Sequence, residues 1–155
     1  LYPFAREATR EAAPADIETL IHFQQRLAVE TESVQLDRDV LQKGIEAMFA
    51  DPAKGRYYVA ELDGEIAGCH MITYEWSDWR NGMVWWLQSV YIKESFRKRG
   101  VFKAMYENLM KMIAVDNRVS GLRLYVEKSN HRAQETYRAM GMNGDHYIVF
   151  EKMKG

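Results

Sequence analysis

A cluster of cationic side chains surrounds one glycine in the middle of the chain. Arg97, Lys98, Arg99 and Lys103 flank Gly100, with an apolar run before them and an amphipathic run after them. A strand that leads through a glycine into a helix presents unpaired backbone N–H groups and the positive end of the helix dipole. The missing Cβ of the glycine also lets a ligand approach the backbone closely. We therefore predict that this stretch binds phosphate groups.

Composition limits the class of protein that carries this run. The 155 residues are 47% hydrophobic and 28% charged, which suits one globular domain over residues 1–155. With a net charge of −1 the chain lacks a wide basic surface, so no nucleic-acid partner is predicted. The longest apolar run, Met83–Leu87, is too short for a bilayer, and no signal-peptide core is seen near the start. We expect a cytoplasmic protein without a membrane partner, although a chain that starts at Leu1 leaves open whether residues precede it.

Hydrophobic periodicity and turn residues predict the elements that must position the basic run. Strands are predicted at residues 4–9, 56–62, 65–74, 83–92, 121–126 and 146–153, and helices at residues 14–27, 38–50, 100–115 and 131–140. Asp63-Gly64 predicts a hairpin turn. The helical spacing of Phe102, Met105, Leu109 and Met112 predicts their side chains on the buried face. The element order favours an α+β fold with a single mixed, mostly antiparallel sheet of six or seven strands, flanked by about four helices.

Two motifs in this order resemble those of the GNAT superfamily of acetyl-CoA-dependent N-acetyltransferases. The strand SVYIKESF followed by Arg97, Lys98, Arg99 and Gly100 is similar to the family's Q/R-x-x-G-x-G/A pyrophosphate loop. The later stretch LYVEKSNHRAQETYRAMGM is similar to the family's strand, Asn, Tyr-bearing helix and closing Gly. The resemblance implies a GNAT-like fold and acetyl transfer from acetyl-CoA to a primary amine, without a metal. Phe102 stands where the family has Gly or Ala, and we expect its ring to point to the core and its N–H to face phosphate.

The resemblance also assigns cofactor and catalytic residues. It implies that the cofactor contacts Val90, Tyr91, Ile92, Arg97, Lys98, Arg99, Gly100, Val101, Phe102, Lys103 and Asn130. Val90 and Ile92 would do so through their backbone, while their side chains equally suit a core. Asn130 equally suits a helix N-cap. Tyr137 would protonate the departing thiolate, because a phenol with a pKa of about 10 stays protonated at neutral pH, although it equally suits packing on its helix.

The proton acceptor and the amine are less constrained. Some family members carry a glutamate base on the strand before the loop, and here Gln88 occupies that position, so no dedicated base is predicted. Candidate substrate-binding residues are Glu30, Glu32, Glu75, Trp76 and Gln88. The segment ETESVQ and the tryptophan-rich stretch around residues 74–86 are expected to contact the acceptor, or the tryptophans pack a sheet face in a homodimer.

Several hypotheses on the acceptor remain open. A small-molecule amine is the first candidate and a protein or peptide amine the second. A catalytically silent domain that senses acyl-CoA would keep the loop and be indifferent to Tyr137. Cys69, the one cysteine of the chain, has no evident partner base, so a covalent route through it is not expected.

Overall fold

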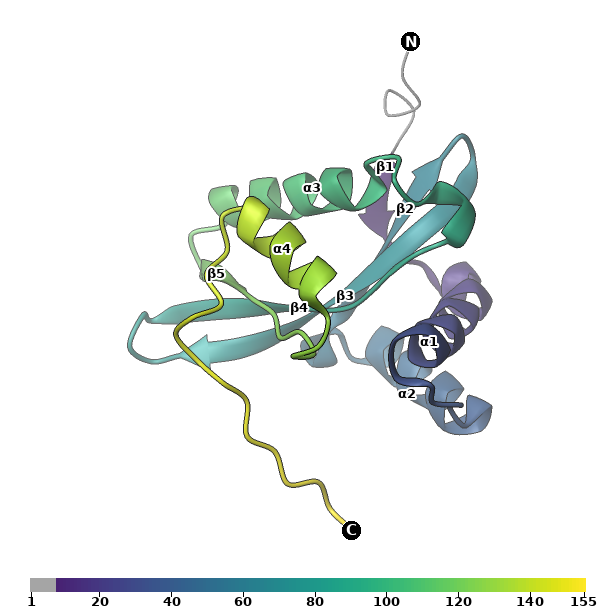
Figure 1. Cartoon of the computed structure of the whole chain (residues 1–155), viewed down its shortest axis with the longest axis horizontal. Coiled ribbons are helices and arrows are strands. Elements are labelled where there is room, and N and C mark those ends of the chain that lie inside the picture. The colour runs from purple at the N-terminus through teal and green to yellow at the C-terminus, as the bar shows by residue number, and fades with distance from the viewer. Residues whose placement is uncertain (1–7) are drawn as a thin grey trace. The chain divides into compact units, whose positions relative to one another are not determined.

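A computed structural model describes residues 8–155, and the chain divides between Arg123 and Leu124 into two compact units. The prediction of a single domain over residues 1–155 stays a prediction. The first unit contains β1 (Ala8–Glu11), α1 (Ile17–Glu32), α2 (Arg38–Ala50), β2 (Arg56–Leu62), β3 (Glu65–Ser77), β4 (Gly82–Ile92), α3 (Val101–Val115) and β5 (Val119–Arg123) (Figure 1). The second unit, Leu124–Gly155, contains α4 (His131–Ala139). Short 3-10 turns occupy Pro14–Asp16, Pro52–Lys54 and Glu94–Phe96.

One sheet organises the first unit, with strand order β1-β2-β3-β4-β5. The first four strands pair antiparallel, and β4 pairs parallel with β5, to which α3 makes the crossover. Asp63 and Gly64 both have positive φ, 55° and 80°, as a tight turn between β2 and β3 requires. The mixed, mostly antiparallel α+β architecture is confirmed. The strand number is corrected, since residues 8–155 hold five strands and not six or seven.

One of the six predicted strands is absent from the described residues, and two others have different bounds. Residues 146–153 are irregular in the structure, although their aromatic and β-branched residues favour a strand. A strand needs a neighbour that accepts its hydrogen bonds, and no ladder pairs this segment within residues 8–155. β5 ends at Arg123 and not at residue 126, and it begins at Val119. Of the strand predicted at residues 4–9, residues 4–7 lie outside the described part. The described strand, β1, begins at Ala8.

Two hydrophobic clusters cover the two faces of the sheet. Leu20 and Ile21 of α1 and Ile45 of α2 pack with Val59 and Cys69 of the strands. The next residue of β2, Ala60, faces the opposite cluster with Val101 and Met105 of α3, because successive side chains of a strand alternate between faces. Figure 1 shows α1 and α2 on one side of the sheet and α3 on the other.

The buried face of α3 differs from the predicted one at two positions, since Val101 is buried in place of Phe102 and Met112 is half-buried. Val101, Met105 and Leu109 are 2%, 1% and 1% exposed, which is the i, i+4, i+8 spacing of a single helical face. Phe102 is half-buried, with its ring centroid 6.2 Å from that of Tyr106. The Phe102 ring, which was expected to point to the core, is thus only partly buried, and the fully buried residue at the start of α3 is Val101, about 100° away around the helix. None of the helices described for residues 8–155 combines the length and the apolarity that a bilayer crossing needs.

Candidate functional site

The loop between β4 and α3 passes twice through the left-handed region. Lys98 has φ 62° and Gly100 has φ 78°, and alternate left-handed residues occur in backbone concavities that bind anions. The first helical hydrogen bond of α3 runs from Ala104 N to Gly100 O over 3.0 Å. The amides of residues 101–103 precede this bond in the first turn of α3, where the positive end of the helix dipole lies. This local geometry suits a bound anion.

The four cationic side chains of the loop are used in different ways. Lys98 and Lys103 are exposed. The Arg99 guanidinium lies over the Phe96 ring, with its Cζ 5.2 Å from the ring centroid. Arg97 is engaged by protein groups on α1 and β4. The two lysines are thus the cations that project from the loop toward solvent.

β4 loses its parallel neighbour part-way along its length. The ladder with β5 ends at the pair Trp86–Arg123, while β4 continues to Ile92. Within residues 8–155, only β3 pairs with β4 beyond that point. Val90 and Ile92, both predicted to contact the cofactor through their backbone, lie in this stretch. Strand edges of this kind bind extended ligands through main-chain hydrogen bonds.

A β-bulge distorts β4 in the same stretch. Gln88 opposes Met71 and Tyr91 opposes Cys69, so two residues of β4 face one residue of β3. Ser89 takes φ 53°, and its carbonyl accepts a hydrogen bond from the Cys69 thiol at 3.8 Å. The bulge re-aims the backbone groups of β4 beside its unpaired edge.

Asn130 and Tyr137 both belong to the second unit, on α4. Asn130 is the N-cap of this helix, and its Oδ1 accepts a hydrogen bond from Ala133 N at 3.1 Å. Tyr137 is half-buried in the last turns of α4, and burial raises the pKa of its hydroxyl above the usual 10. The N-cap role predicted for Asn130 is confirmed, while the cofactor contact of Asn130 and the acid role of Tyr137 stay predictions.

Glu75 ties three strands together where β5 leaves β4. Its carboxylate accepts hydrogen bonds from Trp86 Nε1 at 2.9 Å and from an Arg123 guanidinium nitrogen at 2.9 and 3.1 Å. These bonds hold the pKa of Glu75 below its usual value, so the side chain is ionised at neutral pH. On the same face Gln88 Nε2 donates to Thr73 Oγ1 at 2.6 Å. Sequence spacing did not single out Arg123, because only the strand register places it beside Glu75.

The other residues predicted near the acceptor are spread over the first unit. Trp85 and Trp86 are adjacent on β4 and so point to opposite faces of the sheet, and Trp76 is 58% exposed. Glu32 is exposed at the end of α1, whereas Glu30 in the same turn bonds to Arg97 and Tyr91. The tryptophans therefore do not form one aromatic wall.

Two buried groups in β3 are unsuited to covalent catalysis. Cys69 is fully buried, and burial raises the pKa of its thiol to about 12. His70 is 2% exposed and stacks on Tyr58 at 5.2 Å between ring centroids, and burial lowers its pKa to about 4. A protonated thiol and an inaccessible imidazole are both poor nucleophiles. Among residues 8–155, no three His, Cys, Asp or Glu side chains gather closely enough to bind a metal ion.

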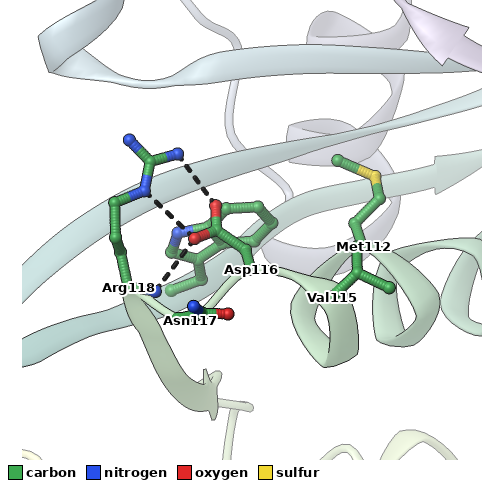
Figure 2. Close-up of a pocket in the computed structure, with 6 residues that line it drawn as sticks. Met112, Val115, Asp116, Asn117 and Arg118 are labelled. Carbon is green, nitrogen blue, oxygen red and sulfur yellow. Dashed lines mark hydrogen bonds and ion pairs between the residues drawn. The ribbon is translucent and has the colours of Figure 1, made fainter.

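A surface depression of about 570 Å³ lies at the C-terminal end of α3. Its lining consists of Trp85, Met112, Val115, Asp116, Asn117 and Arg118 (Figure 2). Two hydrogen bonds of 3.0 and 3.1 Å join the Arg118 guanidinium to the Asp116 carboxylate at its rim. At about 1.5 Å per residue, the 15 residues of α3 separate this depression from the loop between β4 and α3 by about 20 Å. It is therefore a feature distinct from the loop and the β4 edge.

The model of the acetyltransferase (GNAT) family matches residues 17–142. No curated protein matches the chain. A possible acetyltransferase from Clostridium difficile 630 is 39% identical over 96% of this chain and 97% of its own, with a TM-score of 0.90.

Two further solved structures share the fold at lower identity. One is a predicted acetyltransferase from Clostridium acetobutylicum, solved with acetyl-CoA, at 17% identity and a TM-score of 0.73, over 94% of this chain and 96% of its own. The other is glucosamine-6-phosphate N-acetyltransferase from Arabidopsis thaliana, at 18% identity and a TM-score of 0.71, over 96% of this chain and 99% of its own. At these identities the likeness concerns the fold alone.

Proposed function

We propose a function from one premise, which is that the chain belongs to the acetyltransferase (GNAT) family. The proposed reaction moves an acetyl group from acetyl-CoA to the primary amine of a small molecule, by direct attack while both substrates are bound. The observation that carries the proposal is the anion-suited loop at the end of a strand whose outer edge is unpaired. The two features adjoin along the chain, as a ligand with a diphosphate at one end and an extended arm requires.

The donor would be held mainly by backbone groups. The amides of residues 101–103 would bind the diphosphate, and the exposed Lys98 and Lys103 would add charge. The edge of β4 at Val90 and Ile92 would bind the extended arm through main-chain hydrogen bonds. The half-buried Phe102 is compatible with this arrangement, because its amide and not its side chain would face the anion.

The chemistry needs an acid for the sulfur and a hydrogen-bond donor for the carbonyl oxygen. The lone pair of the amine forms the new N–C bond as the C–S bond breaks, and a β4 N–H stabilises the charge that develops on the oxygen. The Tyr137 hydroxyl protonates the departing sulfur and is reprotonated from solvent. Glu75 is bonded to an arginine, and so we assign the loss of the amine proton to water and not to a dedicated carboxylate.

The acceptor would lie on the face of the sheet that carries Gln88 and Glu75. An ionised Glu75 and the neighbouring Trp86 suit a cationic or hydroxylated amine better than an apolar one. Association into a homodimer is a further prediction, for sedimentation velocity to test.

The test of this function is release of free thiol from acetyl-CoA with a panel of polyamines, amino acids, aminoglycosides and peptides. We expect saturable release with at least one small amine, above the hydrolysis seen without amine. If only peptides are acetylated, the small-molecule acceptor is wrong. If the protein binds CoA but no amine gives release, a silent acyl-CoA sensor replaces the enzyme.

Replacement of Tyr137 by Phe tests the acid. We expect kcat to fall about 100-fold, as is typical for loss of a general acid, with little change in the KM for the amine. Because the pKa of Tyr137 is raised, wild-type turnover should also survive to a higher pH than a phenol of pKa about 10 allows. Tyr147→Phe, which makes the same change at a 69% exposed tyrosine of the same unit, is the matched control. Turnover of Tyr137→Phe equal to that of the control would remove Tyr137 from the mechanism.

A further inference from the structure

Glu30 lies in the last turn of α1 and is surrounded by hydrogen-bond donors. Its Oε1 accepts from an Arg97 guanidinium nitrogen at 2.7 Å. Its Oε2 accepts from the Tyr91 hydroxyl at 3.1 Å and from an Arg26 guanidinium nitrogen at 3.3 Å. Partial burial opposes ionisation, but the bonds from Arg97 and Tyr91 hold the pKa of Glu30 below its usual value. Both carboxylate oxygens are therefore engaged, and the group is ionised.

Arg97 is held from three sides. Besides its bond to Glu30, its Nε donates to the carbonyl of Ile92, the last residue of β4, at 2.9 Å. Its Cζ lies 5.4 Å from the centroid of the Tyr91 ring. A guanidinium that is bonded at two nitrogens and stacked on a ring is fixed in both plane and direction. The first residue of the basic run is thus anchored to the end of α1 and to the end of β4.

These contacts give Arg97 a different task from the two exposed lysines of the loop. Its guanidinium points back to protein groups, whereas Lys98 and Lys103 project to solvent. The contact between Glu30 and Arg97 joins positions 67 residues apart in the sequence. It fixes where the loop begins, and the fixed start determines where the amides of residues 101–103 lie.

We propose that Glu30 and Tyr91 are positioning residues for the acetyl donor, whose side chains hold Arg97 and through it the loop between β4 and α3 without touching the donor. The inference rests on the proposed function, because it takes the loop as the donor's diphosphate site. Since α1 ends two residues after Glu30, the same contact ties the donor loop to the segment that is predicted to meet the acceptor.

The direction in which Glu30→Gln changes the affinity for the donor separates a positioning role from a purely electrostatic one. Glu30→Gln removes a negative charge next to the loop. If Glu30 acted only through its charge, the substitution would release Arg97 toward phosphate and tighten donor binding. If Glu30 positions the loop, the same substitution loosens the start of the loop and weakens donor binding.

The experiment measures CoA binding by calorimetry and the kinetics with acetyl-CoA for the full chain. For Glu30→Gln we expect about fivefold weaker CoA binding and an equal rise in the KM for acetyl-CoA, the scale of one partly exposed charged hydrogen bond. We expect kcat to stay within about twofold, because only donor binding is affected. Glu30→Asp, which keeps the charge, should restore part of the affinity. Glu107→Gln removes the same charge from an exposed position of α3 and should bind CoA as the wild type does.

A double variant tests whether Glu30 acts through Arg97. In an Arg97→Gln background, Glu30→Gln should cause no further loss of affinity, since coupled residues are non-additive. Tyr91→Phe removes one of the bonds to Glu30 and should give a smaller loss than Glu30→Gln. Full additivity of the Glu30 and Arg97 effects would overturn the proposal.

CoA binding by the wild type distinguishes failure of the positioning role from failure of the proposed function. Tighter or unchanged CoA binding by Glu30→Gln overturns the positioning role. If the wild type itself binds no CoA, the proposed function fails, and amide hydrogen exchange of residues 97–103 without ligand then decides the positioning role. Faster exchange in Glu30→Gln than in Glu107→Gln supports it, and equal exchange overturns it.

Discussion

Arginine side chains in this protein connect elements that are distant in sequence. Arg97 joins the loop to α1, and Arg123 joins β5 to Glu75 of β3. The planar guanidinium suits this task because it donates in several fixed directions at once. Lysine at either place would keep the charge and lose the geometry. At these two positions the geometry of the guanidinium therefore matters to the structure as much as its positive charge does.

Cys69 is the one thiol of the chain, and its surroundings make it unreactive. It is fully buried, and burial raises its pKa to about 12, so almost no thiolate exists at pH 8. We expect iodoacetamide to leave the folded protein unmodified at pH 8 over hours and to label it once guanidinium unfolds it. The label is measured by mass spectrometry of the intact protein. Labelling of the folded protein as fast as of the unfolded one would contradict the described burial.

At the scale of elements, β4 carries most of the site. It pairs with β3 along its length, with β5 over part of it, and leads into the loop that is proposed to bind the donor's diphosphate. Any shift of β4 against β3 moves both the unpaired edge and the loop. The packing between β3 and β4 should therefore influence donor binding as well as stability.

Gly68 tests this packing. A Cβ on Gly68 would lie 2.5 Å from the carbonyl oxygen of Tyr91 and 2.8 Å from the Ile92 side chain. We expect Gly68→Ala to lower the free energy of unfolding by about 1–3 kcal/mol, because a backbone atom of β4 must move, and to weaken CoA binding. Urea denaturation and calorimetry measure the two effects.

Gly44 supplies the matched control in α2. Nothing lies within 4 Å of a Cβ at Gly44, so Gly44→Ala should raise stability by roughly 0.5–1 kcal/mol through helix propensity. Equal stability of the Gly68→Ala and Gly44→Ala proteins would show that β3 and β4 are not in close contact at Gly68.

At the scale of the whole molecule, His70 makes stability depend on pH. Burial lowers its pKa from 6.5 to about 4, so below pH 6.5 the unfolded chain binds a proton that the folded chain rejects. The contribution of neutral His70 to the free energy of unfolding is fully present above pH 6.5 and is lost as the pH falls toward 4. A shift of this size corresponds to about 3 kcal/mol. Urea unfolding at a series of pH values measures the loss.

His70→Phe should remove this dependence between pH 6.5 and 4, and His22→Gln, at an exposed histidine, should keep it. The carboxylates with lowered pKa, such as those of Asp16 and Glu75, begin to lose their contribution only as the pH falls through their ordinary pKa values of 3.8 and 4.5. The same pH dependence in wild type and His70→Phe would assign it to another group.

Local signals in the sequence correctly predicted caps, turns and the glycine that begins α3. Asp37 caps α2 through hydrogen bonds to Asp39 N and Val40 N, as its position before an apolar-periodic run predicts. Asp63-Gly64 forms the predicted turn. Gly100 takes positive φ where a strand enters a helix. In each case the cause lies within a few residues, and so the sequence pattern contains it.

Features that depend on contacts between distant residues could not be predicted from the sequence. Residues 146–153 have the alternation of a strand, but alternation does not supply a partner strand. Phe102 and Val101 are equally apolar neighbours, and only the packing of α3 on the sheet decides which is buried. The contact between Glu30 and Arg97 depends on how α1 packs beside β4. The pattern that predicted phosphate ligands could not tell that Arg97 would face a carboxylate of its own chain.

The end of the ladder between β4 and β5 also bears on how the molecule folds. β2, β3 and β4 are joined by short turns and pair with their neighbours in the chain, so this meander can form from local contacts. β5 pairs parallel with β4 and needs the α3 crossover first, which brings a larger loop-closure entropy. The edge of β4 that the proposed donor would use is thus what remains when a late, long-range pairing stops at Trp86. The end of the ladder at Trp86 and Arg123 thus limits the late pairing during folding and also leaves the rest of the β4 edge open to a ligand.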